Sequence, residues 1–392
     1  MEDYGYYRQR SRERRTRQGG GGLALRVADG VMAVVTAVCS LLLIGAMAAR
    51  FVSPERMWWP ALLGLIFPVL YAAGIVCCLW WVVRWKRVAI AVAVLLLFGL
   101  KPADAYWQPD LRKHYGEEAP SKSDIVVMSY NVKGFDKQFA TEEKTTRQLI
   151  ADLANDNCVD ILCCQEFAGD VSDPEIRPML PDLPYFRVVP YDCDSERTVY
   201  GGLAVFSRYP IVGWKALPAR DEDRLFSMWA DVKIGRDTVR VFNNHLNSTY
   251  LGSSDVDYLS SFRFVSAEGR KARVGDIVRK LRDSYRKRAP QADTVAQAIA
   301  ASPYPVIVCG DFNDTPASYA YHTVRGKRLR DAFVAKGRGL QGTYGGFFNM
   351  FRLDYILTDR EAVEVLHYYP FDVVYSDHMP VAAGVALGES DL

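Results

Sequence analysis

Several apolar runs of the sequence end in residues whose side chains can bind metal ions or transfer protons. Asn131 ends "VVMSYN", Glu166 ends "ILCCQE", and His245 lies near the end of "VFNNHL". Further along, "VIVCGDFND" ends in Asp311, Asn313 and Asp314, Asp354 lies within "RLDYIL", and Asp377 and His378 lie in "YSDHMP". If the ends of these runs meet at one edge of a folded domain, they form a site of carboxylates, amides and two imidazoles.

This combination of side chains suits the hydrolysis of phosphate esters. Oxygen ligands such as Glu166 and Asp377, with amide oxygens nearby, favour Mg²⁺ or Mn²⁺, whereas a zinc site would use more His or Cys. Such an ion neutralises phosphate charge and activates water, and a histidine paired with a carboxylate supplies proton transfer. The residues therefore predict a metal-dependent phosphoric ester hydrolase.

The runs that carry these residues have the length and composition of short β-strands, with fewer helical stretches between them. They are continuously apolar rather than alternating, which indicates sheets covered on both faces. The segment from Thr141 to Asn155 has helical spacing, with Leu149, Ile150 and Leu153 on one face. Two central sheets flanked by helices would satisfy this pattern.

The ordered set "SYNV", "QE", "GGLAVFSRYPI", "NNHL", "GDFND", "RLDYIL" and "SDHMPV" resembles the successive motifs of the endonuclease/exonuclease/phosphatase superfamily. The resemblance covers roughly Ser121 to Leu387. It implies an α+β fold, the four-layer α/β/β/α sandwich of the deoxyribonuclease I-like proteins. Each fragment is weak evidence alone, but the complete set in order is specific.

The resemblance also implies catalytic roles. His378 matches the catalytic histidine, and Asp354 matches the carboxylate that orients its ring. Asp311 matches the residue that positions or deprotonates the attacking water, and Asn313 the amide that holds the phosphate. His245 matches a second histidine that contacts the phosphate or the leaving oxygen.

Metal and substrate contacts follow from the same resemblance. Glu166 matches the principal ligand of Mg²⁺ or Mn²⁺, with Asn131 beside it, and Asp377 is similar to a metal-site or supporting carboxylate. Tyr344, in "GTYGG", is a looser match to a residue that lines the site and binds substrate, together with Asn313 and His245.

Each assignment has a simpler structural alternative. Asn131 and Asn313 are residue types that often form turns, and an isolated His245 on an apolar strand is more often a core residue. For Asp314 and Asp136 the structural interpretation is preferred. A catalytically inactive binding module is a further alternative, disfavoured because such a module has no need for the complete set.

The N-terminal part of the chain has a different character. Residues 1–22 are arginine-rich and nearly free of aliphatic side chains, which predicts a disordered basic tail. Residues 23–107 contain three apolar runs, at about 27–49, 58–83 and 88–106, and a membrane-spanning helix needs about 20 residues. We predict three transmembrane helices, a linker over 108–120 and a catalytic domain over 121–392.

The distribution of basic residues predicts the orientation. Seven basic residues precede the first run and "RWKR" follows the second, whereas the first loop carries only Arg50 and Arg56. Since Lys and Arg are retained on the cytoplasmic side, three spans place the catalytic domain outside the cytoplasm. We expect an integral protein of a bacterial inner membrane with a periplasmic catalytic domain, and a cytoplasmic domain if the third run does not span.

The substrate is less determined than the reaction. The phosphodiester of a nucleic acid is the first expectation, and a phospholipid headgroup, as for sphingomyelinases, is the alternative. Between Arg263 and Arg288 there are ten basic and three acidic residues, with Val274, Ile277, Val278 and Leu281 at helical spacing. A solvated helix face, a nucleic-acid contact and an anionic membrane contact all fit this pattern. Apart from substrate and bilayer, no obligate protein partner is predicted.

Overall fold

A computed structural model describes residues 3–109, 125–192, 198–199, 201–220, 224–249, 267–346 and 349–388. The predicted linker over 108–120 lies almost entirely outside these residues, as do residues 263–266 at the start of the basic segment. Two six-stranded sheets form the centre of the catalytic domain. The order of the first sheet is β12 (Leu329–Asp331), β14 (Asp354–Asp359), β11 (Val306–Asp311), β10 (Asp237–His245), β9 (Leu225–Ile234) and β8 (Ile211–Pro218). The order of the second is β15 (Val363–Pro370), β16 (Val381–Leu387), β2 (Ile125–Asn131), β3 (Ile161–Gln165), β7 (Gly202–Ser207) and β5 (Tyr185–Pro190). Short paired strands lie outside them, namely β1 (Trp107–Gln108) with β13 (Gly339–Leu340), and β4 (Gly169–Asp170) with β6 (Thr198–Val199).

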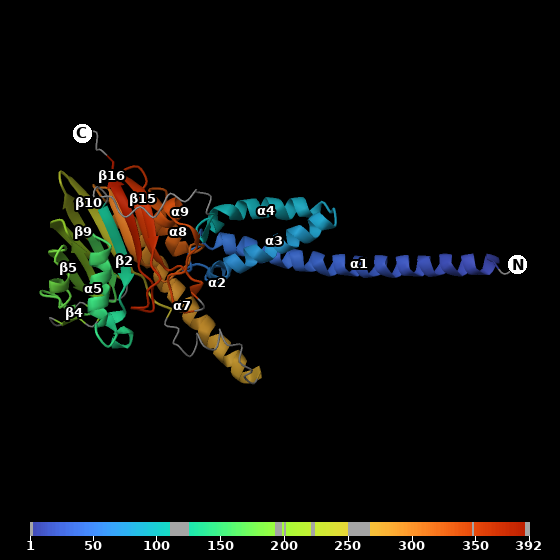
Figure 1. Cartoon of the computed structure of the whole chain (residues 1–392), viewed down its shortest axis with the longest axis horizontal. Helices are drawn as coiled ribbons and strands as arrows, with labels where there is room; N and C mark the ends of the chain where they lie inside the picture. The colour runs from blue at the N-terminus through green and yellow to red at the C-terminus, as the bar shows by residue number, and fades with distance from the viewer. Residues whose placement is uncertain are drawn as a thin grey trace.

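The two sheets pack face to face, and helices cover their outer faces (Figure 1). Along β2, Val127 packs into the core between the sheets, while its neighbours Val126 and Met128 pack on the opposite side. This alternation explains why the strand is apolar throughout, since both of its faces are buried. The outer helices are α5 (Thr146–Asp156) on the second sheet, and the C-terminal half of α7 (Ala267–Ala300) with α8 (Tyr319–Arg325) on the first. The predicted four-layer α+β sandwich is therefore confirmed.

Helix α5 begins later than its sequence pattern predicts. A capping box formed by Thr145 and Gln148 sets the start at Thr146, so the segment from Thr141 is not helical. The apolar residues of this helix that are buried are Ile150, Ala151 and Ala154. Leu149 and Leu153, which were predicted on the same face as Ile150, are only partly buried.

Polar side chains cross the space between the sheets below the strand ends. The amide of Gln165 donates to Asn243 Oδ1 at 2.7 Å, and Asn243 donates to the carbonyls of Cys164 and Ala204, each at 2.9 Å. Buried amides of this kind are stable only when their hydrogen bonds are satisfied, so they fix the position of one sheet on the other. Asn243 in "NNHL" is thus a structural residue.

The N-terminal region consists of α1 (Asp3–Ala48), α2 (Trp59–Leu65), α3 (Phe67–Val83) and α4 (Val88–Ala103). Helix α1 starts inside the segment expected to be disordered, where Arg, Gln and Glu have high helix propensities. By length and hydropathy Gly22–Ala48 is a candidate membrane span, and the pair α2 and α3 is a second candidate bent by 70°. Pro68 accounts for the bend, because a proline ring clashes with the carbonyl four residues earlier. Helix α4 has 16 residues and is shorter than the other candidates.

The four N-terminal helices contact the catalytic domain at one end of their bundle (Figure 1). Helix α2 packs on α7, and Ala317 of the catalytic domain lies among the buried residues of α1 and α3. The helices α8 and α9 (Ala332–Lys336) lie on the same side of the domain (Figure 1). The rest of α1 extends away from the catalytic domain.

Candidate active site

Strand register brings the predicted residues together. In the first sheet, His245 at the end of β10 pairs with Asp311 on β11, and Asp311 pairs with Asp354 on β14. In the second sheet, Asn131 on β2 pairs with Gln165 on β3, directly before Glu166. Hydrogen bonds join the two groups, because the Asn131 amide donates to Glu166 Oε1 at 3.0 Å and to Asp311 Oδ2 at 3.1 Å.

Glycine at position 310 permits this register. Its φ is +143°, and a Cβ atom there would lie 2.1 Å from the backbone oxygen of Asn244. Since no side chain fits at that distance, only glycine allows β11 to deliver Asp311 beside β10.

His378 and Asp354 form a buried pair. His378 Nδ1 lies 2.8 Å from Asp354 Oδ2, and the side chains are 7% and 0% exposed. Burial lowers the pKa of His378, but the charges of Asp354 and Asp311 outweigh it and raise the pKa to about 10. At neutral pH the ring is therefore an imidazolium held in a fixed orientation.

Asp311 lies at the centre of the site. One of its oxygens, Oδ2, is 3.6 Å from His378 Nε2 and 3.7 Å from His245 Nε2. The backbone N–H of Asn313 donates to Oδ1 at 2.7 Å, and the Asn313 amide donates to Oδ2 at 3.2 Å. Burial raises the pKa of Asp311, which the nearby imidazoles partly oppose. Its position between two histidines is suited to accepting a proton.

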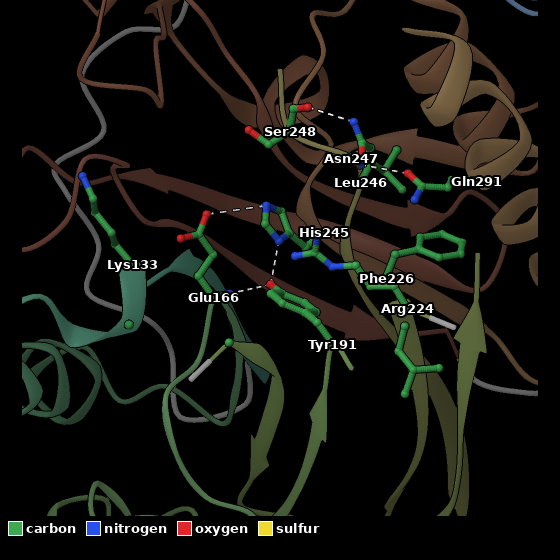
Figure 2. Close-up of a pocket in the computed structure, with 13 residues that line it drawn as sticks. Lys133, Glu166, Tyr191, Arg224, Phe226, His245, Leu246, Asn247, Ser248 and Gln291 are labelled. Carbon is green, nitrogen blue, oxygen red and sulfur yellow. Dashed lines mark hydrogen bonds and ion pairs between the residues drawn. The ribbon is translucent and has the colours of Figure 1, made fainter. Parts of the chain in front are cut away.

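His245 has a different partner, Tyr191, at 2.6 Å from Nδ1 (Figure 2). The Tyr191 hydroxyl also accepts the backbone N–H of Glu166 at 2.8 Å, and burial raises its pKa, so it stays protonated. A hydroxyl that accepts this N–H can donate its own proton to Nδ1 of the neutral imidazole. The ring proton is then on Nε2, which lies 3.6 Å from Glu166 Oε1 and has no hydrogen-bond partner among the described residues.

Two of the predicted residues have strained backbones. Glu166 and Asn313 both have a backbone φ of +51°, a value that residues other than glycine rarely adopt. Such conformations cost about 1–3 kcal/mol and persist where the surrounding structure imposes them, often at functional sites. In both residues the backbone N–H makes a hydrogen bond within the site. The N–H of Glu166 donates to the Tyr191 hydroxyl, and the N–H of Asn313 donates to Asp311 Oδ1.

The donor atoms fit a hard divalent cation at Glu166. Its side chain is 39% exposed, and it lies beside the buried carboxylate of Asp311. A second group of potential ligands, Asp311, Asp354 and His378, has ligand atoms within 4.8 Å of one another, and one oxygen of Asp354, Oδ2, is already hydrogen-bonded to His378 Nδ1. Carboxylate oxygens at Glu166 and Asp311 match the preference of Mg²⁺ or Mn²⁺.

Two predicted ligands are arranged differently from the expectation. Asn131 turns its amide nitrogen toward the carboxylates, and its oxygen accepts the Lys133 N–H at 3.1 Å. Asn131 therefore orients the carboxylates of Glu166 and Asp311, and its oxygen is not directed toward a metal ion beside them. Asp377 forms an ion pair with Lys133 Nζ at 2.8 Å. The ring of Tyr344 lies 5.2 Å from that of His378, and its role in binding substrate stays a prediction.

A pocket of about 440 Å³ opens beside Glu166 and His245 (Figure 2). Its polar lining includes Lys133, Arg224, Asn247, Ser248 and Gln291. Gln291 belongs to α7 and accepts the backbone N–H of Asn247 at 2.8 Å, so α7 forms one wall. The pocket can therefore hold a polar or anionic group next to the central carboxylates.

Sequence patterns did not identify Tyr191, Lys133, Arg224 or Gln291. Tyr191 directly follows β5 and lies outside the sequence motifs, so only the fold brings it to His245. Lys133 was within reach of a sequence argument, because it follows Asn131 by two residues. The structural interpretation of Asp314 and Asp136 is supported, since Asp314 is buried beside Arg288 and Asp136 caps a short helix.

Comparison with known sequences agrees with this geometry. Residues 128–378, more than half of the chain, match the Endonuclease/Exonuclease/phosphatase family. The chain belongs to this family and is a hydrolase of its superfamily. Residues 29–106 match a second family, a domain of unknown function designated DUF8431. No curated protein matches the chain.

Several solved structures resemble the catalytic domain. An endonuclease/exonuclease/phosphatase from Bacteroides vulgatus is 20% identical, with a TM-score of 0.45, covering 68% of this chain and 100% of that chain. A mannosyl-6-phosphatase from Bacteroides thetaiotaomicron is 18% identical, with a TM-score of 0.48 and coverages of 67% and 99%. The catalytic domain of human Nocturnin with bound sulfate is 18% identical, with a TM-score of 0.46 and coverages of 69% and 96%.

Proposed function

We propose that this protein is a membrane-anchored phosphodiesterase that depends on Mg²⁺ or Mn²⁺. The observation that carries the proposal is the position of Asp311 Oδ2, which lies 3.6 and 3.7 Å from two imidazole Nε2 atoms. One carboxylate between two potential proton donors is an arrangement for hydrolysis rather than for binding alone. This argues against the inactive binding module.

Each residue has a chemical task in the reaction. Asp311 holds the attacking water and accepts its proton, and its raised pKa makes it a stronger base. His378, charged through its pairing with Asp354, donates from Nε2 to the oxygen on which negative charge develops. His245 donates from Nε2 to the phosphate, and Asn313, whose amide donates to Asp311 and to the Leu246 carbonyl, holds Asp311 in position.

Glu166 would hold the metal ion, with Asn131 orienting the carboxylates. When bound, the ion neutralises phosphate charge and polarises the phosphorus–oxygen bonds. Glu166 and His245 both line the pocket, so a phosphate held there would be in reach of both side chains.

A phospholipid headgroup is the substrate that the pocket favours. The pocket, of about 440 Å³, has the size of a site for one small ligand group. Its wall helix α7 also packs against α2 of the N-terminal region. A headgroup in the bilayer would thus have a short path to the site. Nucleic acid, the first expectation from the sequence, is the second candidate, supported by the basic residues of α7.

Turnover by the full chain in lipid nanodiscs tests both substrates. Vesicles of sphingomyelin or phosphatidylinositol, plasmid DNA and RNA are supplied with Mg²⁺, Mn²⁺ or chelator. We expect metal-dependent headgroup release that is lost in Glu166→Ala. Cutting of nucleic acid with no release from vesicles would favour the nuclease instead, and no metal-dependent turnover of any phosphodiester would refute the proposal.

We also propose three membrane spans and an extracytoplasmic catalytic domain. The ring of Phe51, in the loop after α1, lies 5.0 Å from that of His322 in the catalytic domain. With three spans, this loop and the chain after α4 are on the same side of the membrane, as the contact requires. The topology can be tested with a cysteine placed at the C-terminus of the protein and labelled in intact cells with a membrane-impermeant reagent. Protection of this cysteine from the reagent would contradict the proposed topology.

A further inference from the structure

The loop that follows Asp311 is held by residues from outside the catalytic site. This loop, Asp311–Ala317, carries the central carboxylate and Asn313, whose backbone is strained. Such a conformation needs surrounding contacts to persist. Those contacts come from three directions, namely the end of the N-terminal region, helix α7 and the strand β14.

The first contact is made by Tyr106, three residues after the end of α4. Its buried hydroxyl accepts the backbone N–H of Ala317 at 3.2 Å, and its ring stacks on Phe67 of α3 at 5.8 Å. Ala317 is 1% exposed and packs in the same cluster as Leu43 of α1. The end of the catalytic loop is thus embedded in the N-terminal helices.

Helix α2 approaches the loop equally closely. A Cβ atom on Gly64 would lie 2.9 Å from the Cβ of Ala49 and 3.4 Å from the Ala317 carbonyl oxygen. Glycine at this position therefore allows the close packing of α2 on Ala49, and its backbone lies within van der Waals reach of the loop.

The second contact runs through α7. One face of this helix packs on Ala61 of α2 through Ile277, Leu281 and Tyr285. Less than one turn beyond Tyr285, Arg288 donates from its guanidinium to the Asn313 carbonyl and lies 3.5 Å from the Asp314 carboxylate. Arg288 is 1% exposed, so α7 connects the packing on α2 to the loop beside the active site.

The third contact is made by Tyr355 of β14, and Arg352, just before this strand, links the same region to the N-terminal part. Arg352 Nη2 donates to the Ala105 carbonyl at 2.8 Å and to Asp331 at 2.7 Å. Close by, the Tyr355 hydroxyl donates to the Asp314 carbonyl at 2.8 Å. Asp311 and Asp354 are the two carboxylates near His378. The chain segments that carry them are therefore held by residues that border the N-terminal helices.

From these contacts we propose that the N-terminal helical region completes the active site, and that Tyr106 and Arg288 are positioning residues for Asn313 and Asp311. The proposal rests on the hydrolase function proposed above. The region is then more than an anchor, because the loop depends on it for its strained geometry. The proposal also predicts that a catalytic domain cut free at Ser121 loses activity as well as its attachment.

The test compares tyrosines in the full chain in nanodiscs. Tyr106→Phe keeps the ring but leaves the Ala317 N–H without its acceptor, which is costly for a buried group. Tyr71→Phe is the matched control, because the Tyr71 hydroxyl donates to Leu96 within the N-terminal region. With bis(p-nitrophenyl) phosphate as a soluble substrate, we expect kcat to fall about three- to tenfold in Tyr106→Phe, with KM within about twofold of the wild-type value.

A second pair of variants addresses α7. Arg288→Lys keeps a positive charge but loses the planar group that reaches the Asn313 carbonyl, whereas Arg282→Lys changes an arginine on the same helix that pairs with Asp283. Only the first should lower kcat.

Hydrogen–deuterium exchange of the peptide covering residues 306–318 gives a readout without turnover. We expect faster exchange in Tyr106→Phe and wild-type exchange in Tyr71→Phe. Wild-type kcat and exchange in both Tyr106→Phe and Arg288→Lys would overturn the proposal. If the wild-type chain turns over no phosphodiester, the hydrolase proposal fails, and the exchange rates alone decide whether the helices hold the loop.

Discussion

The two histidines of the site lie close to the same oxygen of Asp311 but have different hydrogen-bond partners. His378 Nε2 lies 3.6 Å from it and His245 Nε2 lies 3.7 Å from it. Behind the ring, His378 has the carboxylate of Asp354 at 2.8 Å, whereas His245 has the hydroxyl of Tyr191 at 2.6 Å. The two rings are thus similar in position and differ in the charge behind them.

That difference separates two functions of an imidazole. A carboxylate partner raises the pKa and keeps the ring charged, as for His378. A neutral hydroxyl partner fixes which nitrogen carries the proton and adds no charge. We therefore expect His378 to act as an acid in the reaction, and His245 to act as a hydrogen-bond donor to the phosphate.

The largest effect should come from removing the charged histidine. We expect His378→Ala to lower kcat by about 10³–10⁴-fold and His245→Ala by about 10²-fold, the upper and lower parts of the range of about 10²–10⁴-fold for a positioned acid or base. Steady-state kinetics of both variants on one phosphodiester measure the contrast. Equal losses in the two variants would contradict the division of roles.

Glu166 lies on the His245 side of the site, so its removal should change metal use. For Glu166→Gln we expect kcat to fall about 10²–10³-fold and the Mg²⁺ concentration for half-maximal activity to rise at least tenfold, because a carboxylate ligand is lost. Titration of activity with Mg²⁺ and with Mn²⁺ measures both. Asp377→Asn is the informative comparison, since Asp377 is paired with Lys133, and a similar rise there would place it among the metal ligands.

The sequence predicted the residues around His378, but it did not predict the partner of His245. His378 and Asp354 lie in motifs with a recognisable order, as do Asp311, Asn313 and Glu166. The strands between them were also predictable, because their residues are apolar on both faces. Tyr191 could not be predicted, since it lies outside every motif and reaches His245 only through the pairing of β5 with β7 and the packing of the two sheets.

The N-terminal region shows the same limit at a larger scale. Its apolar runs were evident from composition, but the 70° bend before α3 and the docking of Tyr106 on Ala317 depend on tertiary contacts. The apolar positions Ile277 and Leu281 predicted a helix face without indicating that the face packs on α2.

The pH dependence should distinguish the two partners. The folded-state pKa of His378 is raised above its ordinary value to about 10, so the imidazolium contributes stability that is complete below pH ~6.5 and is lost as the pH rises through about 10. In Asp354→Asn the lowering effect of burial remains and the main opposing charge is gone, so the pKa falls. We expect the alkaline limb of the kcat profile to move toward neutral pH and kcat to fall about 10²-fold at pH 7. An alkaline limb at the wild-type position would show that His378 does not supply the proton.

The smallest effect should come from the neutral partner. In Tyr191→Phe the ring packing is retained, but His245 Nδ1 and the Glu166 N–H both lose the hydroxyl. The neutral imidazole can then carry its proton on either nitrogen, so the donor form is only partly populated and kcat should fall about three- to tenfold. Tyr130→Phe is the control, because the buried Tyr130 hydroxyl has no hydrogen-bond partner among the described residues. Because Tyr191 contributes no charge, its loss should leave the alkaline limb of the pH profile in place, unlike the loss of Asp354. A shift of that limb in Tyr191→Phe would mean that the two histidines titrate as one unit, and the difference between their partners would then carry no functional meaning.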